Sequence, residues 1–312
     1  MDDLNSIELN NIIAGKKPIT QQAYKREYKR LTTLLGVDNV IDLKKNVSNL
    51  SIKTIIKKIK DSDFSTNTKK GLFNMLVMIF QKNPNFKSQQ VKVESEREKM
   101  NNKIEIERKD KNKELLETLP AQKTIDKDLN DLYNQKEYLK YIINYLVITY
   151  NLRNKDLCLK IVSSMKQTKD TEFNYLVITE KYVSFIRNVY KTVKTHGKKD
   201  NRVQSKKFRN ALLNYINEVE GEDDVKEDGL IIFKDSKGDP VNCNNLGYKI
   251  KKVIMTLKDD NGNDINLNET KLNKIKVKEI NDKPNTIKGL EKMKKNRGTN
   301  LNTIAEYYSI DI

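Results

Sequence analysis

The feature that most constrains the fold of this chain is a change in hydrophobic pattern at Leu119-Pro120. Before this point apolar side chains recur at helical spacing, and Ser65 is placed to cap one of the helices. One stripe holds Tyr24, Tyr28, Leu31 and Leu35, and another holds Leu72, Met75, Leu76, Ile79 and Phe80. Residues 1–118 are therefore expected to form a compact bundle of short helices, with a highly charged exposed helix or linker from about residue 88.

Beyond Pro120 the pattern becomes mixed. A buried helix is predicted from Leu139, Ile142, Ile143, Leu146 and Val147, and it runs up to Arg153. Strands are predicted at residues 173–179, 187–194 and 229–233, and helices at 208–219 and 246–257. We therefore expect a mainly α chain with a small antiparallel β-sheet (α+β), divided into domains at 1–118 and 119–312.

The charge of the chain points to a polyanionic partner. Its 312 residues include 60 Lys and Arg against 43 Asp and Glu, a net charge of +17. Such a surplus favours nucleic acid first and an anionic membrane second. The alternative is a basic, solvated surface without a function. The prediction of nucleic-acid binding therefore needs support from motifs.

Cysteine and histidine usage narrows the class of protein. Cys158 and Cys243 are too few and too far apart in sequence for a disulfide framework, and His196 is the sole histidine. A reducing compartment and no structural metal are expected. No apolar run reaches the length of a membrane span, and the first residues lack the pattern of a signal peptide. The sequence thus predicts a soluble, intracellular protein without a membrane partner.

Two glycine-containing stretches do not predict a cofactor. The stretch around Gly262 would put Leu257 and Asn268 at the first and twelfth ligand positions of a calcium loop, where carboxylates are needed. The segment Gly197-Lys198-Lys199 lacks the upstream glycine and the following Ser or Thr of a phosphate-binding loop. We therefore expect no cofactor.

The most informative segment is Leu152-Arg153-Asn154-Lys155-Asp156-Leu157, at the end of the buried helix. Taken alone, Arg153 and Asp156 could be an ordinary surface pair three residues apart. In this position the segment resembles the Leu-Arg-x-x-Glu/Asp-Leu motif of the tyrosine recombinases (the phage-integrase family). The resemblance implies that Arg153 is a catalytic arginine.

Two further segments extend the resemblance. The basic stretch from Tyr190 to Lys198 looks like the β-hairpin that carries a catalytic lysine, with Lys194 favoured and Lys191 as the alternative. Such a hairpin could also sit beside phosphates without catalysing anything. The His-x-x-Arg motif of the family is degenerate, because Asn273 stands in place of histidine and Lys276 in place of arginine.

The C-terminal segment is similar to the part of the family that carries the tyrosine nucleophile. Tyr308 matches its spacing from Lys276, and Tyr307 is the alternative. Thr299 stands where the family has histidine, and Arg297 is a candidate for the missing guanidinium. The helical residues 1–118 also look like the core-binding (SAM-like) DNA-binding domain of the family.

The resemblance implies a DNA recombinase or integrase, diverged and of viral or mobile-element type. It would cut and rejoin double-stranded DNA through a 3′-phosphotyrosyl intermediate, assembled as a dimer or tetramer, without metal or ATP. Because Asn273, Lys276 and Thr299 depart from the family pattern, a catalytically weakened DNA-binding or architectural protein is the alternative. A basic structural protein of a virus particle is a third hypothesis, which rests on composition.

Overall fold

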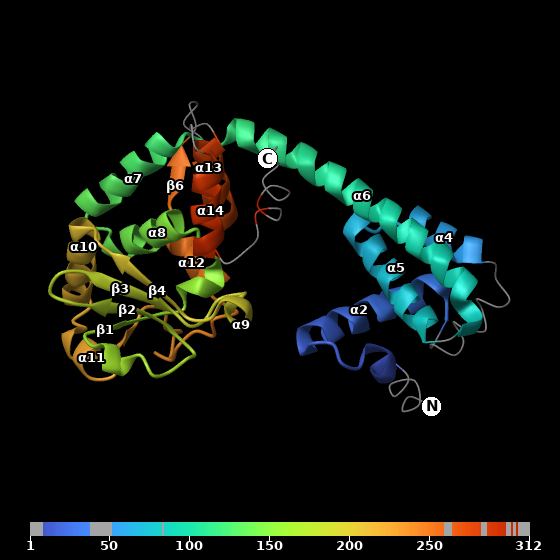
Figure 1. Cartoon of the computed structure of the whole chain (residues 1–312), viewed down its shortest axis with the longest axis horizontal. Coiled ribbons are helices and arrows are strands. Elements are labelled where there is room, and N and C mark those ends of the chain that lie inside the picture. Colours follow the sequence, from blue (N-terminus) through green and yellow to red (C-terminus); the bar gives the residue numbers. More distant parts are fainter. Residues whose placement is uncertain are drawn as a thin grey trace. The chain divides into compact units, whose positions relative to one another are not determined.

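The computed structural model describes residues 9–37, 52–82, 84–258, 264–281 and 286–297, together with Leu301 and Ile304. The chain divides into two compact units, Met1–Lys111 and Asn112–Ile312. The division falls within α6 (Lys87–Thr118), whose helical structure confirms one of the two expectations for this charged segment (Figure 1). The sequence places the domain boundary a few residues later, between residues 118 and 119, where the same helix ends.

The described residues of the first unit are helical, as expected. They form α2 (Pro18–Leu35), α4 (Ile52–Asp61), α5 (Thr66–Gln81), the short 3-10 turn η1 (Pro84–Phe86) and the first part of α6. Ser65 caps α5, and its hydroxyl accepts a hydrogen bond from the Thr68 N–H. The predicted stripe of α5 is buried and forms the core with Leu31 of α2 and the isoleucines of α4. Hydrophobic periodicity alone therefore identified the core of this unit.

The second unit is built around a five-stranded sheet. Its strands are β1 (Leu159–Val162), β2 (Asn174–Ile178), β3 (Val183–Arg187), β4 (Lys199–Val203) and β5 (Leu230–Ile231), in the order β4-β3-β2-β1-β5. Strands β1 and β2 are parallel, and the other neighbours are antiparallel. The expected fold class, mainly α with a small sheet, is confirmed, although one strand pair departs from the antiparallel pattern.

Helix α8 (Tyr138–Tyr150) is the central helix of the second unit. It packs against α7 (Gln122–Asn134), α10 (Lys206–Glu218), α12 (Gly247–Val253), α13 (Glu269–Asn281) and α14 (Thr286–Arg297) (Figure 1). The remaining elements are η2 (Asn154–Leu157), η3 (Met165–Gln167), α9 (Val193–His196), α11 (Glu222–Lys226), β6 (Thr256–Lys258) and β7 (Asp264–Asn266). Asn144 is fully buried on α8, donates to the carbonyls of Lys140 and Val253, and accepts from the Met255 N–H. This side chain joins α8 to the segment between α12 and β6.

Two sequence-based assignments are wrong. The strand expected at 187–194 lies earlier, at Val183–Arg187, and the following connection contains the single helical turn α9. All five residues of β3 are buried, including polar Ser184 and Arg187, so the segment lacks the apolar alternation that was sought. The helix expected at 246–257 ends at Val253, because the chain then enters β6.

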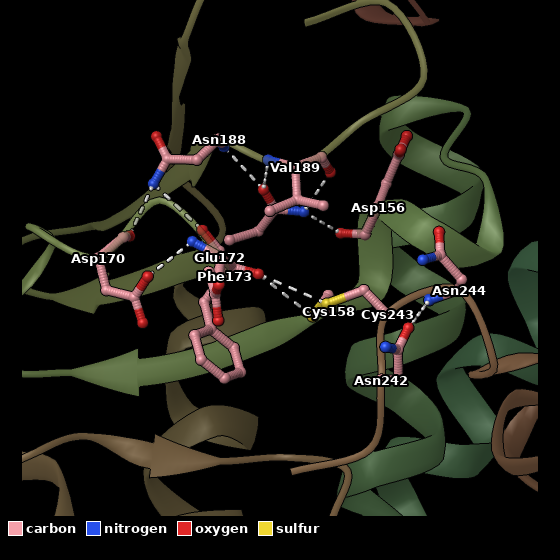
Figure 2. The surroundings of a disulfide bond; sticks show 11 residues. Asp156, Cys158, Asp170, Glu172, Phe173, Asn188, Val189, Asn242, Cys243 and Asn244 are labelled. Carbon is pink, nitrogen blue, oxygen red and sulfur yellow. Dashed lines mark hydrogen bonds between the residues drawn. A yellow bond between two sulfur atoms is a disulfide. The ribbon is translucent and has the colours of Figure 1, made fainter. Parts of the chain in front are cut away.

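Cys158 and Cys243 form a disulfide bond, which contradicts the expectation from their sequence spacing. Their Cα atoms are 5.2 Å apart although the residues are separated by 85 positions, because the fold brings the end of η2 against the loop before α12. Figure 2 shows both sulfur atoms beside the carbonyl oxygen of Glu172, at the start of the segment that becomes β2. The bond therefore ties the end of η2 to the loop before α12.

Candidate functional site

The turn after α8 places Arg153. It begins with Asn151 in the left-handed conformation (φ 53°), and Arg153 opens η2. The Asp156 carboxylate accepts from the Arg153 N–H at 3.2 Å, and the Asp156 N–H donates to the Arg153 carbonyl at 2.8 Å. On the other side, Glu269 of α13 accepts from the Asn154 N–H at 2.5 Å. The backbone of the turn is thus fixed from both sides, while the Arg153 side chain is half-buried.

Asp156, the acid of the Arg-x-x-Asp motif, pairs with an arginine that the sequence did not suggest. The distance from Arg187 Nη2 to Asp156 Oδ2 is 2.7 Å, and both side chains are completely buried. Burial lowers the pKa of Arg187, and the Asp156 charge opposes that shift. The alternative of an exposed Arg153–Asp156 surface pair is therefore wrong, because the Asp156 side chain faces the interior.

A buried asparagine fixes the same region to the sheet. The Asn174 amide nitrogen donates to the carbonyls of Asp156 and Val189, at 2.8 and 2.9 Å. Its oxygen accepts from the Asn188 and Val189 N–H groups, each at 2.7 Å (Figure 2). One side chain on β2 therefore holds both the Arg153 turn and the start of the connection between β3 and β4.

Lys199 also lies near the buried Arg187–Asp156 pair, although sequence reasoning missed it. It is the first residue of β4 and lies opposite Arg187 in the strand ladder. Its amino group donates to the backbone carbonyl of Lys295 in α14 and lies 5.2 Å from the centre of the Tyr190 ring. Burial alternates along β4 and places Lys199 on the inner face with Val203. That alternation could have identified Lys199, but only once the position of the strand was known.

The surroundings of Lys199 favour its neutral form. Its pKa is lowered from 10.5 to about 8, chiefly by burial. Four charged neighbours act on it in addition: Arg187, Arg153 and Lys295 lower the pKa, and Asp156 raises it. A lysine with such a pKa is still mostly protonated at pH 7 and gives up its proton more readily than an exposed lysine.

An open cavity lies beside Lys199. Its volume is about 560 Å³, and it is lined by His196, Lys199, Asp200, Asn201, Glu291, Lys294 and Lys295. Cations outnumber the two carboxylates on its walls, and Arg153 adds a further positive charge nearby. The arrangement suits an anionic group, because fixed cations in a partly buried site attract anions more strongly than cations in open water do.

The two lysines chosen from the sequence lie elsewhere on the same connection. Lys194 is in α9 and Lys191 is just before it, and both side chains are exposed. Tyr190 shapes this segment, because its hydroxyl donates to the Gly197 carbonyl at 2.5 Å. The stretch from Tyr190 to Lys198, expected to be a hairpin, is the connection between β3 and β4, and the lysine whose pKa the Arg153 charge lowers is Lys199, the first residue of β4.

The residues predicted on α13 are engaged with protein groups. The Lys276 amino group forms an ion pair with Glu279 and lines a second cavity of about 400 Å³, which Asn151 and Asn296 also line. Asn273 is buried, and its amide nitrogen lies 3.5 Å from the Leu152 carbonyl. Lys276 therefore shares a cavity with Asn151, where the Arg153 turn begins, and does not line the cavity beside Lys199.

The predicted residues at the C-terminal end lie at or beyond the end of α14. Arg297 is the last residue of this helix, and its side chain lies outside the described part of the structure. Thr299, Tyr307 and Tyr308 lie outside the described residues. The end of α14 contacts the site through the carbonyl of Asn296, which accepts from Arg187 Nη1 at 2.5 Å.

Neither a metal-binding cluster nor a membrane-spanning helix occurs among the residues that the structure describes. Within these ranges no group of three or more His, Cys, Asp or Glu side chains is placed to hold a metal ion. Among the described helices, none combines the length and apolar character needed to cross a bilayer.

No family model and no curated protein matches this chain. Among solved structures, a crystal structure of XerA recombinase is similar to it, with a TM-score of 0.36 and 9% sequence identity. The match covers 97% of this chain and 93% of that chain. At this TM-score the likeness carries no weight for function, which has to be judged from the residues of the site.

Proposed function

We propose that this chain binds double-stranded DNA and that its second unit is a site-specific recombinase, which cuts and rejoins strands. The observation that carries the proposal is the position of Lys199, whose pKa is about 8, beside a basic cavity and near enough to Arg153 for the arginine charge to lower that pKa. Phosphoryl transfer needs a fixed guanidinium for the developing charge and an acid for the leaving oxygen. Arg153 and Lys199 supply these two groups.

The proposed reaction begins with a tyrosine hydroxyl, that of Tyr308 or alternatively Tyr307. Its oxygen forms a bond to phosphorus and its proton passes to solvent, while the bond from phosphorus to the 5′-oxygen breaks. Lys199 gives its proton to the departing 5′-oxygen and thereby takes the role that the sequence had suggested for Lys194. Rejoining reverses these steps: a 5′-hydroxyl attacks the phosphotyrosine, and its proton returns to Lys199.

The rest of the chain would hold DNA. A net charge of +17 favours binding to the phosphate backbone, with affinity that falls steeply as salt concentration rises. The helical first unit is proposed as the DNA-gripping part. Strand exchange joins ends from two duplexes, so assembly of two or four copies on DNA is part of the proposal.

The covalent intermediate is the direct test. The full chain would first select DNA ends that it binds from a random pool. Each selected duplex would then be prepared with a nick near the bound site. After cleavage the short strand diffuses away, so that rejoining is prevented and the protein–DNA adduct accumulates. The adduct should form with the natural sequence and disappear in Tyr308→Phe, or in Tyr307→Phe if that residue is the nucleophile. Tyr248→Phe is the matched control, because this exposed tyrosine on α12 lies outside the proposed site. Failure of every selected end to form an adduct would contradict the proposal.

A second candidate function is DNA binding without catalysis. It is favoured by the degenerate positions on α13, where Asn273 is buried and the Lys276 amino group is held by Glu279. This alternative predicts tight, salt-dependent binding that is unchanged when both tyrosines are replaced, and no adduct on any DNA. The same adduct assay, paired with a binding assay on the double Phe variant, separates the two functions.

A further inference from the structure

Arg187 is an unusual residue for the middle of a protein core. Among the described residues, Arg187 is the largest whose side chain is fully buried, and its relative exposure is 0%. The guanidinium donates to Asp156 and to the Asn296 carbonyl, and its central carbon lies 4.8 Å from the Tyr190 ring centre. A side chain without exposed surface cannot touch a DNA phosphate, so Arg187 does not belong to the groups proposed to contact substrate.

Stability alone does not explain this arginine. Among the described residues its Nε has no hydrogen-bond partner, so one N–H of a buried cation remains unsatisfied. Burying a charged pair is costly, and well-packed apolar side chains of similar size are often equally stabilising or better. The position of the guanidinium therefore calls for a role beyond packing.

The contacts of Arg187 connect the parts of the proposed site. Its partner Asp156 accepts from the Arg153 N–H and so fixes the turn that carries the catalytic arginine. Its other partner is the carbonyl of Asn296, in the last turn of α14, where backbone carbonyls lack helical partners and attract cations. Lys199 binds the same helix end through the Lys295 carbonyl.

We propose that Arg187 is a positioning residue of the DNA-cleaving site, which joins the Arg153 turn to the end of α14 and lies opposite Lys199 in the strand ladder. The proposal rests on the proposed function, but it also predicts how Arg187 and Asp156 affect the ionisation of Lys199, which does not depend on DNA cleavage. The charge of Arg187 opposes protonation of Lys199, whereas that of Asp156 favours it. The two members of the buried pair should therefore act on Lys199 in opposite directions.

The ionisation of Lys199 tests this claim without any DNA. Its side-chain nitrogen would be titrated by NMR in the lysine-labelled full chain, with Lys199→Arg to assign the signal. In Arg187→Met the midpoint should rise from about 8 toward the ordinary 10.5, and in Asp156→Asn it should fall. Arg209→Met is the matched control, since Arg209 binds the Thr179 carbonyl and is absent from the charges that act on Lys199. An unchanged midpoint in Arg187→Met, or a shift in the same direction in both variants, would overturn the proposal.

Cleavage assays test the positioning role itself. Arg187→Lys keeps the charge but loses the planar fork that reaches Asp156 and Asn296 together. It should cut DNA about 100-fold more slowly, because small misplacements of catalytic groups cost that much, while DNA affinity stays the same. Wild-type cleavage by this variant would argue against positioning.

A double variant guards against simple unfolding. Arg187→Met with Asp156→Asn removes both charges of the buried pair and leaves neither without its partner, so it is expected to fold even if either single change does not. It should bind DNA and cleave poorly, and wild-type cleavage by it would also overturn the proposal. If the natural protein cuts no DNA at all, the proposed function fails, and the Lys199 titration still decides whether Arg187 controls that lysine.

Discussion

Reduction of the Cys158–Cys243 bond is expected to destabilise the second unit strongly. The bond closes a loop of 85 residues, and the chain-entropy relation then gives a contribution of about 4.6 kcal/mol to the free energy of unfolding at 25 °C. Measured values for disulfides are usually about 2–4 kcal/mol. For a unit of about 200 residues each kcal/mol shifts the melting temperature by about 2–4 °C, so reduction should lower it by about 10 °C.

The assay is thermal unfolding of the full chain with and without dithiothreitol, followed by circular dichroism. Cys243→Ala should melt at the lower temperature under both conditions, because it has no bond to lose. The first unit, which contains no cysteine, should unfold identically throughout. Equal melting temperatures for oxidised and reduced protein, or two reactive thiols in the denatured, unreduced chain, would refute the reasoning.

Two side-chain contacts and the lowered pKa of Lys199 give four further predictions. Asn144→Leu leaves the Met255 N–H and the Val253 carbonyl without their partner, and urea denaturation should show a loss of about 2–4 kcal/mol from the free energy of unfolding. Ser65→Ala removes the cap of α5 and should cost the first unit about 1 kcal/mol, measured in the same way. Initial rates of adduct formation should fall as pH rises through about 8, because Lys199 loses the proton that the leaving oxygen needs. The pKa of Lys199 is lower in the folded chain than in the unfolded chain, so between pH 8 and 10.5 the unfolded chain binds more protons. The contribution of Lys199 to the free energy of unfolding therefore rises with pH over this range. Lys199→Met should abolish that rise.

Local features of the fold were predictable from the sequence. The stripe of α5 and its Ser65 cap depend on residues a few positions apart, and both are confirmed. The same holds for α8, whose dense apolar face predicted a buried helix that ends just before Arg153. Periodicity and capping are properties of short segments, so they can be read without knowledge of the tertiary structure.

Features that depend on distant parts of the chain were not predictable. Arg187 follows Asp156 by 31 positions, and nothing in the local sequence of either residue indicates that they pair. Cys158 and Cys243 were judged by sequence spacing, which does not limit how close their Cα atoms come in the fold. The inward position of Lys199 depends on where β4 begins, and the strand before it was expected at 187–194 instead of Val183–Arg187. An error of a few residues in a strand changes which side chain faces inward.

The most direct test of the central claim asks which lysine protonates the leaving oxygen. A nicked duplex would carry sulfur in place of the 5′-bridging oxygen at the scissile phosphate, because a thiolate leaves without needing a proton. Initial rates of adduct formation would be compared for this substrate and for normal DNA in Lys199→Met and Lys194→Met. We predict that Lys199→Met is slow on normal DNA and restored on the sulfur substrate, whereas Lys194→Met cleaves both at the natural rate. Normal cleavage of ordinary DNA by Lys199→Met, or a loss that sulfur does not restore, would contradict the account.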